Sequence, residues 1–111
     1  MVPEIVTDST ILSDTIVDGE QTYQAYLAFA TIKNVEVING YGMYLNFPGG
    51  SMKLEGMMGE NVMKMMINSN GKFAFRVFGE ALKGKTITLL PYIAVDDVET
   101  TGDETEELTY Q

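Results

Sequence analysis

The amino-acid sequence predicts a β-rich α+β domain, with an antiparallel meander sheet, one helix in the C-terminal half and a disordered acidic tail. In the first half of the chain, short segments of β-branched and aromatic residues alternate with turn dipeptides, a pattern typical of strands and hairpins. Residues 72–82 instead place apolar side chains at helical spacing. Residues 96–111 are rich in Asp and Glu and poor in large apolar side chains, which is typical of unfolded segments.

Length and composition indicate a single folded domain. The chain has 111 residues, of which 45% are apolar, so it can bury one hydrophobic core. We therefore predict one domain over residues 1–95, followed by a flexible acidic tail over residues 96–111.

The N-terminal segments predict two strands. Residues 4–12 contain β-branched residues in mild alternation, and residues 21–32 follow the turn dipeptide Asp18-Gly19. Residues 21–32 would be apolar on both faces of an extended chain, because apolar side chains occupy odd and even positions alike. Such a strand lies at the centre of a sheet or at an interface, so we expect a homodimer or a higher oligomer.

Two further strands complete the predicted meander. Residues 35–38 alternate valine with other side chains, and Asn39-Gly40 after them is the strongest hairpin signal in the chain. Residues 43–47 form the next strand, which Pro48 ends because proline has no amide hydrogen to donate.

The C-terminal half predicts helical segments. Met and Val at helical spacing indicate a short helix around residues 59–67. Residues 72–82 allow two interpretations, since the aromatic residues at their start would also share one face of a strand. We favour the helix, because the apolar stripe continues to Leu82 and Gly84 would end it.

Residues 86–95 predict the last strand. Pro91 lies within this segment, which indicates an edge strand or a bulge, because proline cannot donate to a sheet ladder.

Charge is distributed unevenly along the chain, whose net charge is −9. Residues 1–52 hold six acids and one base, residues 53–85 three acids and six bases, and residues 86–111 seven acids and no base. The basic middle third is the best functional signal in the composition.

Basic residues interleaved with aromatic residues are typical of proteins that bind single-stranded DNA or RNA, where cations meet phosphates and rings stack on bases. The predicted nucleic-acid-binding residues are Lys53, Lys64, Lys72, Arg76, Lys83, Lys85, Phe73 and Phe75. The alternative is structural: the phenylalanines fill the core and the basic side chains are solvated. On the first interpretation the protein is a non-enzymatic regulator, and it could be encoded by a phage.

The acidic C-terminal residues allow a different function. The predicted partner-binding residues are Asp96, Asp97, Glu99, Asp103, Glu104, Glu106 and Glu107. They could meet a basic cleft of another protein, as in an inhibitor that mimics nucleic acid. They could also fold back over the basic residues or simply keep the protein soluble. A third function is that of a structural subunit in a homo-oligomer.

The sequence points to no enzyme, cofactor or metal. It contains no Cys and no His, which removes cysteine nucleophiles, thiolate zinc sites and the usual general base. The glycines at residues 40–50 lack the spacing of a phosphate-binding loop. No signal peptide or membrane helix is predicted, so we expect a cytoplasmic protein.

Several segments resemble, in sequence order, the stage V sporulation protein G (septation protein) family. They are VTDSTIL with the turn after it, AYLAFATI, VEVINGYGMYLNFP and INSNGK, within residues 4–82. Members of that family are small dimeric α+β proteins that bind DNA or RNA as regulators. The resemblance implies the same fold and function here, with Lys53 in the loop after Pro48, and Lys72 and Arg76 at the start of the helix, contacting nucleic acid.

Overall fold

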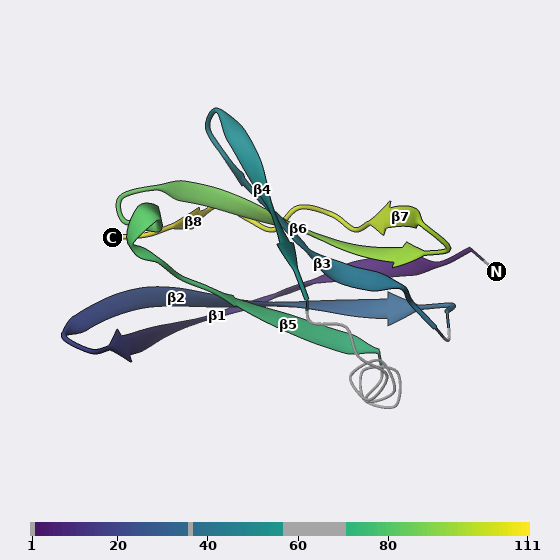
Figure 1. Ribbon diagram of the computed structural model, residues 1–111, viewed down its shortest axis with the longest axis horizontal. Coiled ribbons are helices and arrows are strands. Elements are labelled where there is room, and N and C mark those ends of the chain that lie inside the picture. The colour runs from purple at the N-terminus through teal and green to yellow at the C-terminus, as the bar shows by residue number, and fades with distance from the viewer. Residues whose placement is uncertain (1, 36, 57–70) are drawn as a thin grey trace.

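The computed structural model describes residues 2–35, 37–56 and 71–111, and these residues form an all-β fold (Figure 1). The strands are β1 (Glu4–Asp18), β2 (Gln21–Lys33), β3 (Gly40–Phe47), β4 (Gly50–Glu55), β5 (Lys72–Val77), β6 (Thr86–Val95), β7 (Val98–Thr101) and β8 (Leu108–Thr109). The described residues contain no α-helix, and their one helical segment is the 3-10 turn η1 (Glu80–Leu82).

The strands form two antiparallel sheets. One has the order β1-β2-β5, and the other has the order β4-β3-β6-β7, with β8 also paired to β6. In Figure 1, β2 and β5 lie in the lower half of the molecule, and β6, β7 and β8 lie in the upper half. Both sheets contribute side chains to one core, for example Ala30 and Ile32 from β2 and Leu89 and Ile93 from β6. This is a β-sandwich, the architecture also used by immunoglobulin and fibronectin type III domains.

The predicted hairpin between the first two strands is confirmed. β1 and β2 pair over their whole length, and Gly19 sits in the turn at a φ of 63°, which costs a glycine little. β1 is longer than predicted, and its register shifts between Thr7 and Ile11. This bulge lets one long strand follow the twist of the sheet.

The predicted single meander is wrong beyond this hairpin. β3 pairs with β4 and β6, not with a strand at residues 35–38, and no described residue of that segment belongs to a strand. Asn39-Gly40 leads into β3 instead of closing a hairpin. Ile38 is fully buried, and the Asn39 amide donates to the Ala94 carbonyl, so this connection carries the chain from one sheet to the other.

The predicted α+β class is also wrong, because the helix expected over residues 72–82 is strand β5 followed by η1. Phe73, Phe75 and Val77 alternate toward the core, where they lie opposite Ala30, Ala28 and Tyr26 of β2. Pairing with β2 satisfies the backbone and buries the aromatic row, which outweighs the helical spacing of the residues that follow. The short helix predicted around residues 59–67 lies outside the described residues.

The predicted disordered tail is also wrong. Residues 98–110 form an interrupted edge strand along β6. Backbone amides of Gly102, Thr105 and Tyr110 donate to carbonyls of β6 and of Lys85 just before it. Leu108 and Tyr110 are each only 3% exposed. Their burial anchors an otherwise polar segment, so the folded domain extends to the C-terminal end of the chain.

Pro91 lies in the middle of a central strand, not in the expected edge strand. Its carbonyl accepts from the Gly102 amide, which shows that its nitrogen also faces the C-terminal segment. That segment is interrupted there, between β7 and β8. The missing amide hydrogen therefore falls where β6 has no regular partner.

Candidate functional site

The basic residues predicted to bind nucleic acid are mostly paired with carboxylates of the same chain. The pairs are Lys53 with Glu99 (2.7 Å), Lys72 with Asp8 (3.3 Å), Arg76 with Asp14 (3.6 Å) and Lys83 with Glu80 (3.3 Å). Lys85 forms no ion pair with any described residue. Lys64 lies outside the described residues.

The structure does not bring these basic residues into one patch. Lys53 lies on the outer face of the β4-β3-β6-β7 sheet, whereas Lys72 and Arg76 lie on the outer face of the other sheet. The two phenylalanines predicted to stack on bases also pack within the protein. Phe73 is 6% exposed and Phe75 is half-buried, and both rings contact the Tyr41 ring, at centroid distances of 4.9 and 5.9 Å.

A cluster of Tyr44, Tyr92, Lys53 and Glu99 covers the outer face around β3. The Glu99 carboxylate accepts from the Lys53 amine and from the Tyr44 hydroxyl, and the amine lies 4.8 Å from the centre of the Tyr92 ring. These bonds, the one from Lys53 foremost, hold the pKa of Glu99 below its usual value. The same carboxylate raises the pKa of Lys53. Lys53 also lies 3.9 Å from the Glu55 carboxylate, so Glu99, one of the predicted partner-binding residues, already shares a cation within the chain.

The remaining predicted partner-binding residues line one edge of the sandwich, which we call the acidic edge. It consists of Asp96, Asp97, Asp103, Glu104, Glu106 and Glu107. All six are exposed, and none forms an ion pair with a described base. Asp96 and Asp97 form the tight β6–β7 turn with φ of 52° and 66°, and the others follow along β6. The carboxylates are thus carried on a backbone that the sheet holds in place.

The acidic edge continues onto β1. A groove of about 310 Å³ is lined by Asp103, Glu104 and Glu106 on one side and by Asp8 on the other. The Thr7 hydroxyl, at the floor of this region, donates to the Asp103 carbonyl. Four acidic residues from two segments of the chain therefore line one groove, where the fields of their carboxylates add.

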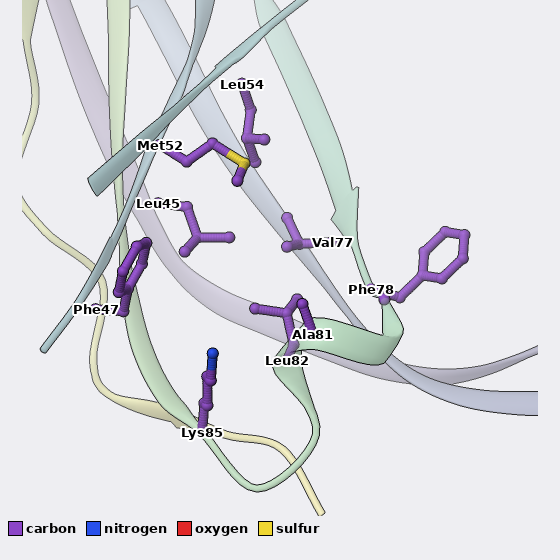
Figure 2. A pocket seen from close by; sticks show the side chains of 10 residues that line it. Leu45, Phe47, Met52, Leu54, Val77, Phe78, Ala81, Leu82 and Lys85 are labelled. Atoms are coloured by element: carbon purple, nitrogen blue, oxygen red, sulfur yellow. The ribbon is translucent and has the colours of Figure 1, made fainter. Parts of the chain in front are cut away.

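An apolar groove of about 320 Å³ opens between strands β3 and β4 of one sheet and the end of β5 with η1 (Figure 2). It is lined by Leu45, Phe47, Met52, Leu54, Val77, Phe78, Gly79, Ala81, Leu82 and Lys85. Figure 2 shows the Lys85 amine directed toward the groove and the Phe78 ring turned away from it. Met52 is 56% exposed here. The groove can accept an apolar group, with the Lys85 amine, which has no ion-pair partner among the described residues, at its rim.

Sequence reasoning named the acidic residues but missed both grooves, since each groove combines elements far apart in the chain. Among the described residues, no three Asp or Glu side chains are placed to hold a metal ion, and no helix could span a membrane. The prediction that the chain is not an enzyme stays a prediction.

Comparison with known proteins identifies no relative. No family model, no curated protein and no solved structure matches the chain. The resemblance to the stage V sporulation protein G family therefore stays a prediction, and its expected helix over residues 72–82 is absent.

Proposed function

We propose that this chain is a non-catalytic protein-interaction module whose acidic edge binds a basic partner protein. One observation carries the proposal: six exposed carboxylates without a described basic partner lie on an ordered edge of the sandwich. Because β6 holds the backbone of this edge, binding would order little chain and lose little conformational entropy. The carboxylates would steer a Lys- or Arg-rich surface toward the edge and fix its orientation.

Nucleic-acid binding, the other predicted function, finds less support in the geometry. A phosphate would have to replace the carboxylate partners of Lys53, Lys72 and Arg76 in a protein of net charge −9. It stays a prediction, to be tested by anisotropy with labelled single-stranded DNA and RNA at low salt. Deletion of residues 96–111 is unsuitable for that test, because it would remove two strands.

The test of the acidic edge uses a labelled oligolysine peptide as the probe. The test variant carries the three changes Asp103→Asn, Glu106→Gln and Glu107→Gln. In the unaltered protein these three carboxylates accept no hydrogen bond from a described residue, so their replacement breaks no hydrogen bond. We expect peptide affinity to fall about tenfold at low salt, since each exposed charge contributes a few tenths of a kcal/mol to about 1 kcal/mol.

The matched control neutralises three exposed carboxylates elsewhere: Glu4→Gln, Asp18→Asn, Glu20→Gln. It changes the net charge equally, so its affinity should stay within about threefold of the unaltered protein. Equal losses in both variants would show that the peptide senses only net charge and would refute a site at the acidic edge.

A further inference from the structure

The outer face of the β1-β2-β5 sheet is apolar along its centre. Directly paired residues of antiparallel strands share a face, and the pairs Leu12 with Leu27 and Phe29 with Ala74 both lie opposite the core. Leu12 is 49% exposed, and Leu27 and Phe29 are only partly buried. Strand β2 is apolar on both faces, and no described residue covers its outer face.

Charges of opposite sign border this apolar centre. The acids Asp8 and Asp14 come from β1, and the bases Lys72 and Arg76 come from β5. Each pair reaches across β2, and the Asp8 carboxylate also accepts from the Thr31 hydroxyl on the way. The face thus has an acidic side, an apolar middle and a basic side.

We propose that a second copy of this chain docks on this face, about a twofold axis parallel to β2. Such an axis places β1 of one copy over β5 of the other, and β2 over β2. Asp8 and Asp14 of each copy then face Lys72 and Arg76 of the other, while Leu27 and Phe29 meet their own counterparts. An axis across the strands would instead set like charges against each other, so the charge pattern selects the first arrangement.

The size of the face sets the strength of the dimer. Three strands about 4.8 Å apart and roughly ten residues long at about 3.3 Å per residue give a face of roughly 500 Å² per copy. Interfaces of this size hold weak, reversible complexes, so we expect a Kd between about 10 µM and about 1 mM. The six residues of the acidic edge belong to the segment along β6, and only Asp8 both lines the groove beside that edge and belongs to the dimer face.

The first test is sedimentation equilibrium of the full chain from about 10 µM to about 1 mM. Leu12→Glu should weaken the dimer at least about tenfold, because it buries a charge at the apolar centre. Val17→Glu is the matched control: it lies on the same strand and is 71% exposed, but its pairing with Thr22 places it on the opposite face. This control should dimerise like the unaltered chain.

The second test changes the charges on the two sides of the face. Arg76→Asp places an acid against Asp14 of the other copy, and Asp14→Arg places a base against Arg76 of the other copy, so each variant should be monomeric alone. Mixed in equal amounts, the two variants should form a heterodimer, because each acidic side then meets a basic side. Circular dichroism of each variant checks that loss of the pair within one chain leaves the fold intact.

An unaltered chain that stays monomeric at about 1 mM would overturn the proposal. So would a dimer that Leu12→Glu leaves intact, or folded charge variants that fail to associate when mixed.

Discussion

Tyr110 shows how one side chain near the C-terminus ties the acidic segment to the core. Its hydroxyl donates to the Val77 carbonyl at 2.7 Å, and its ring packs edge-on against Tyr26 at a centroid distance of 5.0 Å. The residue is 3% exposed, and burial raises its pKa to about 12. At the residue scale, the Tyr110 side chain joins the C-terminal segment to the end of β5.

Replacing Tyr110 by Phe keeps the ring and removes the hydroxyl. The Val77 carbonyl then loses its partner, so we expect the free energy of unfolding to fall by about 1–3 kcal/mol. Between pH 10 and about pH 12 the unfolded chain releases the Tyr110 proton while the folded chain keeps it, so stability should fall with rising pH. Urea unfolding at pH 8 and pH 11 checks both effects; the variant should lose less stability over this interval, and an equal loss would contradict the assignment.

Gly42 is the second residue whose identity the packing dictates. A Cβ at this position would overlap the Leu54 carbonyl and lie 2.8 Å from the Tyr92 ring. We expect Gly42→Ala to destabilise the protein by about 1–3 kcal/mol, as overpacking does. Gly40→Ala is the control, since its Cβ would lie 3.6 Å from the Ala94 side chain, an ordinary contact. Thermal unfolding that showed equal effects of the two changes would contradict this explanation.

At the element scale, the C-terminal segment acts as the outer strand of the second sheet. β7, β8 and the residues between them hydrogen-bond along β6 and bury Leu108 and Tyr110. The acidic residues of this segment are exposed, with Glu99 and Glu104 also accepting hydrogen bonds from side chains of the same sheet, and charged side chains on an edge strand discourage pairing with other chains. One segment therefore completes the fold and carries the proposed binding surface.

Truncation after Val95 removes this outer strand. The unpaired β6 edge and the uncovered core should leave the chain largely unfolded or aggregated, because loss of buried Leu and Tyr side chains costs several kcal/mol. Circular dichroism and sedimentation velocity measure the outcome, with truncation after Tyr110 as the control. A monomeric, cooperatively folding chain of residues 1–95 would contradict the role given to β7 and β8.

At the scale of the whole molecule, the negative net charge opposes the stability of the fold. The chain carries a net charge of −9, and the acidic edge has no basic partner among the described residues. Repulsion among these carboxylates lowers the stability of the compact state, and salt screens it. Repulsion among the carboxylates therefore lowers the stability of the sandwich, and a bound basic partner would reduce this repulsion.

Raising the ionic strength should stabilise this protein. We expect the melting temperature to rise by a few degrees between about 20 mM and about 300 mM NaCl, because screening weakens the repulsion among acids. The triple variant Asp103→Asn, Glu106→Gln, Glu107→Gln should show a smaller rise. A melting temperature that fell with salt would mean that the surface ion pairs outweigh this repulsion.

Local composition predicted two of the strands and the turn between the first two. Residues 21–32 and 86–95 were placed correctly as β2 and β6, and Asp18-Gly19 was placed correctly as a turn. These predictions succeeded because the strand preference of β-branched and aromatic residues and glycine's freedom at positive φ act within a few residues. The six residues of the acidic edge were likewise identified from composition alone.

Tertiary contacts decided the rest. Whether residues 72–77 become strand or helix depends on the free edge of β2, and whether the acidic segment is ordered depends on the edge of β6. The ion pairs that occupy Lys53, Lys72 and Arg76 join residues 46 to 64 positions apart. The sequence by itself determined a β-rich chain with an acidic end; only the folded sandwich decided which strands pair and which charges stay free, because both depend on residues brought together from distant parts of the chain.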